Sequence, residues 1–258
     1  IIIERPWVIM KNDELSFIEA ELNSPLDNID SASSVGDIPP PDPERMLKLL
    51  ESAVASDRML AARAFCELED RRSIPILIKL LKDICPLIRV STAYALGRNP
   101  DATAVEPLIE LLETDFNGYV RKGIVWALGN SKDRRALQPL LHALKTDISA
   151  VRLWAASGLA QIAPANYEDI IAAIPPLIQG LRRDQIAAVR SNCAWAIGQL
   201  CRELPSNVVY ATAIDALIES LVEDDDYGVK DDARSAILKV GDPRGLQMIE
   251  ELEFEGLI

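Results

Sequence analysis

The sequence predicts an all-α fold, an α-α superhelix of about six stacked helical hairpins. Three observations support this prediction: an apolar motif that recurs along the chain, helical spacing within each copy, and helix-start and helix-end residues between copies. The chain has 258 residues, of which 49% are hydrophobic and only 5% aromatic. This largely aliphatic composition suits close helix-on-helix packing. An array of this length needs no single large core, because each unit packs only on its neighbours.

The first element of each repeat is a short apolar stretch. In the first full copy the leucines recur at i, i+3 and i+4, which is typical of one helix face. Four copies begin with Pro75, Pro107, Pro139 and Pro176, which fit a first helical turn because the missing N–H costs nothing there. We therefore expect a helix, called helix A, at each copy. The copies start 32, 32, 37 and 40 residues apart and are PILIKLL (75–81), PLIELLE (107–113), PLLHALK (139–145), PLIQGLR (176–182) and ALIESLV (216–222).

A second helical element, helix B, follows each copy of the first. Gly97, Gly129, Gly198 and Gly241 stand where helix C-caps are expected. A degenerate first repeat begins near Pro43. One hairpin cannot bury its apolar face alone, but about six stacked hairpins can. The B elements are 57–66, 88–97, 120–129, 151–160, 189–198 and 229–238.

An acidic and a basic residue recur at fixed spacing in these repeats. Each Asp is expected in the turn between helices A and B, where it can cap backbone N–H groups and pair with an Arg of its own or the adjoining unit. A reactive group would not be needed in every repeat, so we interpret the pattern as structural. It resembles the Asp/Arg ladder of HEAT repeats and predicts a HEAT/armadillo-like solenoid. The pairs are Asp83 and Arg89, Asp115 and Arg121, Asp147 and Arg152, Asp184 and Arg190, and Asp224 and Lys230.

The chain divides into two regions of different composition. Residues 1–43 form an acidic, Ser/Pro-rich extension or linker with nine Asp/Glu against two Lys/Arg. Such a segment orders, if at all, on a partner. Its start, IIIERPWVIM, carries Trp7 and is expected either to anchor the chain or to lie on the solenoid or a neighbour. Residues 44–258 form the repeat domain, with longer repeats at 164–173 and 201–213 whose insertions are expected in loops or longer helices.

Charge and composition exclude several classes of partner. The net charge of −13 disfavours nucleic acid and anionic membranes and favours a basic protein. No apolar run approaches the roughly 20 residues of a transmembrane segment. The four cysteines form no C-x-x-C pair, which is typical of reduced thiols. Cys66, Cys193 and Cys201 are expected to be packed, and Cys85 is the best candidate for an exposed thiol.

The sequence predicts no catalytic and no metal site. His142 is the single histidine and falls in a helix A, so a site with several imidazoles is excluded. The His-Glu pairs with which the HEAT-repeat enzyme deoxyhypusine hydroxylase binds iron are absent. GDPRG (241–245) contains Gly, Asp and Pro in the order of a helix end and a helix start, and it needs no phosphate ligand. No cofactor is expected, although a bilin or an iron–sulfur cluster shared with a partner stays an alternative.

The most promising surface is the face of helix B opposite its core face. Counting from the repeated basic residue, positions +2, +5 and +9 share that face. B helices line the concave side of HEAT-type solenoids, and exposed Trp, Tyr and Arg are typical of binding hot spots. We expect a partner-binding groove there; the alternative is that the rings wedge between adjacent B helices. Its residues are Arg63, Tyr94, Arg98, Trp126, Asn130, Trp154, Gln161, Asn192, Trp195 and Gln199.

Residues 43–258 also resemble a known family, the phycobilin-lyase-type HEAT-like repeat proteins of cyanobacteria and plastids. Four stretches are similar to one branch, described as the partner of an A-type iron–sulfur carrier. The resemblance implies a soluble scaffold in a cyanobacterial cytoplasm or a chloroplast stroma, without a demonstrated activity. The stretches are DFNGYVRKGIVWALGNSKDRRAL (115–137), AVRLWAASGLAQ (150–161), AVRSNCAWAIGQLCRELPSNVVYATAIDALIE (188–219) and VGDPRGLQMIEELEFEGL (240–257).

Three functions follow from these patterns. The preferred one is a non-enzymatic protein-binding scaffold or assembly factor of an oxygenic phototroph. One alternative is a subunit of a phycobilin lyase or bilin chaperone, although the Asn-His-Cys motif of isomerising lyases is absent because Ala143 follows His142. The other is an accessory subunit of a photosynthetic complex or an iron–sulfur-related assembly.

Overall fold

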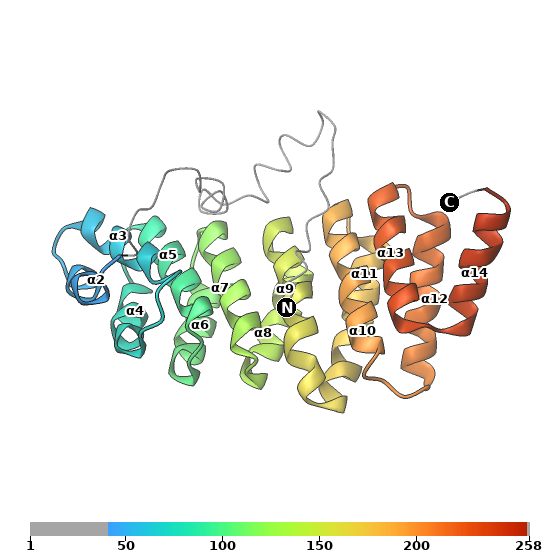
Figure 1. Ribbon diagram of the computed structural model, residues 1–258, viewed down its shortest axis with the longest axis horizontal. Coiled ribbons are helices and arrows are strands. Elements are labelled where there is room, and N and C mark those ends of the chain that lie inside the picture. Colours follow the sequence, from blue (N-terminus) through green and yellow to red (C-terminus); the bar gives the residue numbers. More distant parts are fainter. Residues whose placement is uncertain (1–40, 257–258) are drawn as a thin grey trace.

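The computed structural model describes residues 41–256, and every regular element in that range is a helix. The predicted all-α HEAT/armadillo-like superhelix of about six hairpins is confirmed, with a further helix α14 (Pro243–Phe254) at its end (Figure 1). Residues 1–40 of the predicted N-terminal extension, which include Trp7, lie outside the described residues. The hairpins pair α2 (Pro43–Leu50) with α3 (Ala55–Ala64), α4 (Ile74–Leu80) with α5 (Pro86–Arg98), α6 (Ala102–Thr114) with α7 (Gly118–Ser131), α8 (Leu137–Thr146) with α9 (Ser149–Ile162), α10 (Tyr167–Arg183) with α11 (Ala187–Cys201), and α12 (Val208–Glu223) with α13 (Tyr227–Val240).

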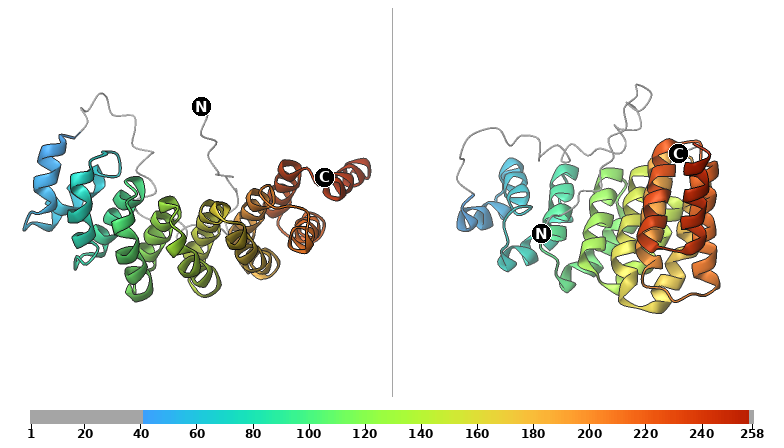
Figure 2. Two further views of the ribbon diagram at one scale, coloured as in Figure 1. Left: turned by 90° about the horizontal axis from the view of Figure 1, so that it is seen from below. Right: turned by 45° about the vertical axis from the view of Figure 1, so that its right-hand side comes forward.

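The array curves with its B helices on the inner side. The six hairpins follow one another along an arch (Figure 2). Each B helix packs extensively on the next B helix, whereas successive A helices touch more sparsely. The inner side of a curved stack is the shorter one, so its helices are closer together. The B helices α3, α5, α7, α9, α11 and α13 therefore line the concave face, as the sequence predicted.

The prolines mark helix starts less consistently than expected. Pro75 stands in the first turn of α4 and Pro139 at the third residue of α8. The prediction was wrong for Pro107 and Pro176, which lie inside α6 and α10. Both helices begin several residues earlier because an upstream polar side chain caps them, Asp101 on α6 and Asn166 on α10. The longer repeats at 164–173 and 201–213 mainly lengthen the outer helices α10 and α12.

Glycines of the B helices also have a different role from the one predicted. Only Gly241 is a C-cap, with a left-handed φ of 74°. Gly97, Gly129 and Gly198 lie inside α5, α7 and α11 instead. A Cβ on Gly129 would stand 2.8 Å from the Cα of Gly158 in α9. These glycines therefore let neighbouring B helices approach closely, and that contact keeps the inner face continuous.

The turn at 241–245 is built as the sequence predicted. Gly241 ends α13, and the Asp242 carboxylate accepts a hydrogen bond from the Arg244 backbone N–H at the start of α14. Pro243 occupies the first turn of α14. Helix ends thus explain Gly241, Asp242 and Pro243 of this motif.

Candidate partner-binding groove

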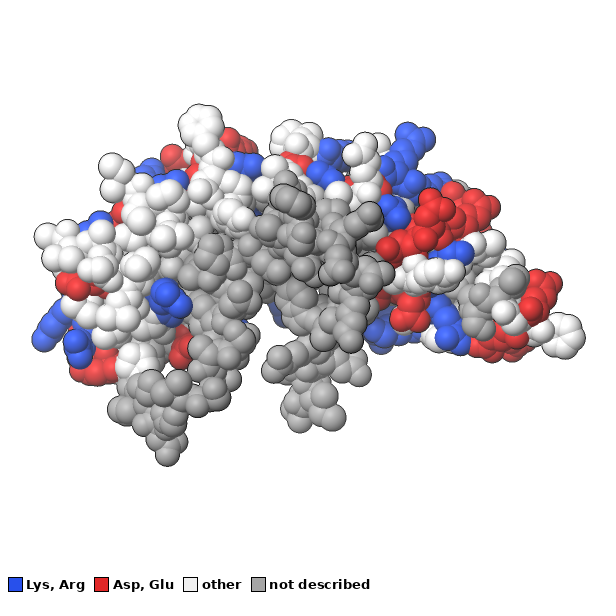
Figure 3. Space-filling model, turned by 90° about the horizontal axis from the view of Figure 1, so that it is seen from above, with Lys and Arg blue, Asp and Glu red and all other residues white. Residues whose placement is uncertain are grey.

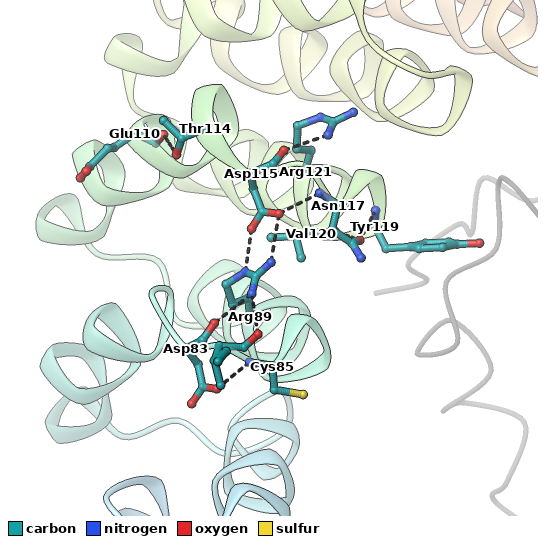
Figure 4. A network of polar contacts seen from close by, with 11 residues as sticks. Asp83, Cys85, Arg89, Glu110, Thr114, Asp115, Asn117, Tyr119, Val120 and Arg121 are labelled. Carbon is teal, nitrogen blue, oxygen red and sulfur yellow. Dashed lines mark hydrogen bonds and ion pairs between the residues drawn. The ribbon is translucent and has the colours of Figure 1, made fainter.

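An ion-pair ladder holds the B helices in register. The Arg at the start of each B helix reaches the Asp in the A–B turn of the next hairpin. Arg89 is typical: its Nε and Nη2 donate to the Asp115 carboxylate at 2.7 and 3.1 Å, while its Nη1 donates to the Asp83 carbonyl oxygen of its own hairpin (Figure 4). The ladder pairs, with their shortest distances, are Arg58–Asp83 (2.8 Å), Arg89–Asp115 (2.7 Å), Arg121–Asp147 (2.6 Å), Arg152–Asp184 (2.7 Å) and Arg190–Asp224 (2.8 Å).

The ladder carboxylates are fully used. Each also accepts a hydrogen bond from a backbone N–H of its own turn, as Asp115 does from Asn117 at 2.8 Å. Burial alone raises the pKa of Asp83, but hydrogen bonds from the Arg58 guanidinium and the Cys85 N–H outweigh it, and the pKa lies below the ordinary 3.8. The ladder ends at Lys230, whose Nζ donates to the Val222 carbonyl oxygen at 2.7 Å. The predicted capping and inter-unit pairing are both present.

The ten residues predicted for the groove all stand on the inner B helices. Arg63 and Arg98 are exposed, and the other eight are half-buried. Tyr94, Trp126, Trp154 and Trp195 each pack one side against the core and are not sealed in it. The two interpretations of these rings are therefore not exclusive, because each ring wedges between helices and still presents a surface. We call this set of ten residues the groove.

An aromatic cluster with a cation lies where α5 meets α7. The rings of Tyr94 and Trp126 have centroids 5.2 Å apart at an interplanar angle of 50°. The Arg98 guanidinium lies 5.8 Å from the Trp126 ring centroid, within the range of a cation–π contact. Trp126 fits here because Gly97 has no Cβ; one would stand 2.4 Å from the indole ring. A second cation, Lys122, which is not among the predicted groove residues, lies 6.0 Å from the Trp154 ring centroid.

The amide side chains of the groove are partly committed to structure. Asn192 Nδ2 donates to the Leu153 carbonyl oxygen and to Ser157 Oγ, both at 2.6 Å. Asn130 Nδ2 reaches the Gly97 carbonyl oxygen at 3.4 Å. Both amides thus link a B helix to the preceding one. These two residues support the groove floor more than they offer donors to a ligand.

The two ends of the inner B-helix face carry opposite charge. Arg63 and Arg98 stand at the N-terminal end, and no ion pair links either of them to a residue within 41–256. At the other end, Asp231 is exposed and Asp232 accepts a hydrogen bond from the Ser191 hydroxyl. Burial, with the nearby negative charge of Asp231, raises the pKa of Asp232. The inner face is therefore not uniformly acidic, although the chain's net charge is −13.

The cysteines and His142 form no reactive centre in the described part of the chain. Cys193 and Cys201 are buried, as predicted, and burial raises the pKa of Cys201 to about 12. Cys66 and Cys85 are half-buried, and burial raises the pKa of Cys66 to about 12. His142 is exposed on α8. Between residues 41 and 256, no three His, Cys, Asp or Glu side chains gather as metal ligands.

Sequence reasoning missed a second surface, along the A–B turns. Ile84 and Phe116 directly follow ladder aspartates and are almost fully exposed. An open cleft of about 450 Å³, lined in part by Phe116, lies beside the Arg89–Asp115 pair. On this edge uncharged side chains predominate toward the N-terminal hairpins, and acidic ones gather toward the C-terminal end (Figure 3). The sequence does contain a signal for this second surface, because Ile84 and Phe116 both occupy the position after the repeated Asp.

Stacked A/B hairpins joined by a ladder define the class of α-helical repeat proteins. The family model of HEAT repeats matches residues 43–125, 105–173 and 174–252. The chain belongs to this family. No curated protein is similar enough to count as a relative. Across the described residues, no helix has both the length and the hydropathy needed to cross a bilayer.

Solved structures share the fold. An engineered protein is 26% identical, with a TM-score of 0.60 over 78% of this chain and 98% of that one. A designed armadillo repeat protein in complex with the peptide (KR)4 is 23% identical, with a TM-score of 0.60 over 77% and 98%. The CpcE–CpcF complex of phycocyanin lyase from Nostoc sp. PCC7120 is 19% identical, with a TM-score of 0.54 over 88% and 98%. The last two likenesses concern the fold alone.

Proposed function

We propose that the chain is a non-enzymatic scaffold or assembly factor that docks an extended segment of another protein in its groove. One observation carries this proposal: the inner B-helix face presents half-exposed aromatic rings next to the guanidinium groups of Arg63 and Arg98, which form no ion pair with a residue of 41–256. Aromatic residues and Arg dominate the energetics of protein interfaces. The ladder, by contrast, has its hydrogen-bonding groups satisfied within the array, so it offers little to a ligand.

Two further observations support a role in binding rather than catalysis. The designed armadillo repeat protein that shares the fold is in complex with the peptide (KR)4. Within residues 41–256, the thiols of the half-buried Cys66 and the buried Cys201 have a pKa far above neutrality, which makes them poor nucleophiles. From the sequence resemblance we place the protein in a cyanobacterial cytoplasm or a chloroplast stroma, within a photosynthetic or iron–sulfur-related assembly.

The decisive test removes two groove rings. Trp126→Ala with Trp195→Ala deletes rings on two well-separated B helices, α7 and α11. Affinity purification of the tagged chain from a phototroph lysate, followed by mass spectrometry, should lose the specific partner, because losing two hot-spot rings at about 2 kcal/mol each weakens binding about a thousandfold. The far-ultraviolet circular dichroism of the variant should keep its helical signal.

The matched control removes two aromatic rings outside the groove. Phe116 and Tyr227 are almost fully exposed at the A–B turns, so Phe116→Ala with Tyr227→Ala deletes apolar surface without touching the inner face. This variant should retain the partner. A partner that survives loss of the groove tryptophans, or that is lost only in the control, would move the binding site away from the groove.

A second candidate function is a subunit of a phycobilin lyase or a bilin chaperone. The fold shared with the CpcE–CpcF complex favours this candidate. A linear tetrapyrrole would lie along Tyr94, Trp126 and Trp195. Incubating the purified chain with a bilin and recording visible absorption and fluorescence tests it; an unchanged bilin spectrum rejects it. An accessory subunit of a photosynthetic complex, the third alternative, would instead co-purify with that complex without pigment of its own.

A further inference from the structure

The N-terminal half of the groove lacks counter-charges. Every ladder Arg is paired with a carboxylate, but Arg63 and Arg98 form no ion pair with any residue from 41 to 256. Arg63 stands on α3 and Arg98 on α5, which packs directly against α3. The half-exposed Trp126 ring lies directly beside Arg98. A ligand that fits this half therefore carries carboxylates interleaved with apolar side chains.

One segment of this chain has that composition. Asp13–Leu22 reads DELSFIEAEL and contains neither Lys nor Arg. Its acidic residues are Asp13, Glu14, Glu19 and Glu21, and its large apolar residues are Leu15, Phe17, Ile18 and Leu22. Acidic residues can pair with the two guanidinium groups while apolar ones cover the indole. The charge pattern of the segment is thus complementary to the pattern of the groove.

The connection between the segment and the array has a suitable length. Eighteen residues, 23–40, separate Leu22 from Pro41, which precedes α2 in the first hairpin. A linker of that length has a root-mean-square span of about 23 Å and reaches at most about 60 Å. Packed helices are about 10 Å apart, so α5 and α7 lie about 10 and 20 Å beyond α3. The linker is therefore long enough to bring the segment from the first hairpin to Arg98 and Trp126.

We propose that Asp13–Leu22 docks in the N-terminal half of the groove, with its carboxylates on Arg63 and Arg98 and its apolar side chains on Trp126. This inference rests on the proposed function in one respect, that the groove accepts an extended segment. Tethering makes weak contacts sufficient: at an effective concentration of about 1 mM, a Kd of about 0.1 mM keeps the segment docked about ten times more often than free.

Limited proteolysis of the full chain with thermolysin tests the proposal. Thermolysin cleaves before large apolar residues, so its sites at Leu15, Phe17, Ile18 and Leu22 do not depend on the charges that the variants alter. Mass spectrometry of the first products gives the cleavage rate within the segment. Arg63→Glu with Arg98→Glu should raise that rate about tenfold, because the docked population is lost. In the wild type, raising the salt concentration should have the same direction of effect.

Two further variants make the outcome unambiguous. Arg45→Glu with Arg183→Glu makes the same charge change at exposed positions of the A helices α2 and α10 and should leave the rate unchanged. Adding Glu14→Arg, Glu19→Arg and Glu21→Arg to the groove variant should restore protection. Equal rates in the wild type and the groove variant, equal acceleration in the control, or no rescue would overturn the proposal. No partner takes part in the assay, so its failure leaves the result for partner capture unaffected.

Discussion

The ladder and the groove stand on the same B helices but differ in how far their polar groups are satisfied. The ladder repeats one pair five times, and each Asp and Arg side chain has a partner within 41–256. The groove changes from hairpin to hairpin: position +5 reads Arg63, Tyr94, Trp126, Ser157 and Trp195 along the first five. The guanidinium groups of Arg63 and Arg98 have no carboxylate partner within residues 41–256, and the aromatic rings of the groove are half-exposed.

The difference between ladder and groove reflects two requirements on the same helices, stacking and ligand binding. A group needed to stack units is needed at every junction, so it repeats and is saturated by its neighbour. A group needed for a ligand is set by the ligand, which differs along its length, so the residues vary and keep surface open. A residue pair that repeats at every junction and has its polar groups hydrogen-bonded therefore indicates a structural role. Residues that differ between hairpins and keep exposed surface indicate a binding role. The expected effects below follow this division.

The largest effect should come from breaking a ladder junction. Asp115→Ala should lower the free energy of unfolding by about 3 kcal/mol, because it leaves the Arg89 guanidinium and the Asn117 N–H without their acceptor in a site where the carboxyl is only 3% exposed. Urea titration followed by circular dichroism measures the change.

The matched control is an ion pair at the same junction. Lys82 and Glu110 are 3.4 Å apart, but their side chains are 70% and 63% exposed. Glu110→Ala should cost less than about 0.5 kcal/mol. Equal costs for the two alanine variants would break the comparison, since the ladder would then be no more structural than an ordinary surface pair.

The second effect is a pH dependence that a ladder carboxylate contributes. The pKa of Asp83 is lowered, so its ionised form stabilises the fold above the ordinary value of 3.8, and this contribution is lost as the pH falls through the lowered pKa. Asp83→Asn should therefore destabilise the protein by about 1 to 2 kcal/mol at neutral pH. The difference between variant and wild type should shrink once the pH falls below 3.8. Thermal unfolding from pH 3 to 8 measures both; a pH-independent difference would contradict the role of charge.

The sequence predicted those features of the fold that repeat along the chain. The hairpins, the ladder and the inner position of the ten groove residues all follow from spacing, because helical geometry converts spacing into direction. The errors at Pro107 and Pro176 arose from capping residues a few positions upstream. Others arose where an interaction between hairpins decides. Gly97 looks like a helix end in sequence, but it is a space for the Trp126 ring. Asn192 stands on the predicted binding face, but its side-chain amide donates a hydrogen bond to the Leu153 carbonyl oxygen in α9. Neither contact has a local signal, since its partner lies more than 25 residues away.

The smallest expected effect on stability concerns Asp232, at the acidic end of the inner B-helix face. The pKa of Asp232 is raised, mainly by burial, so its ionised form costs stability and the fold weakens as the pH rises through the raised pKa. Asp232→Asn keeps an oxygen to accept the Ser191 hydroxyl and removes the charge. It should stabilise the protein at neutral pH by less than about 1 kcal/mol, because the site is half-exposed and screened. The gain should disappear below pH 3.8, the opposite trend to Asp83→Asn in the same thermal scans. A loss of stability at neutral pH would instead make Asp232 a structural carboxylate like those of the ladder.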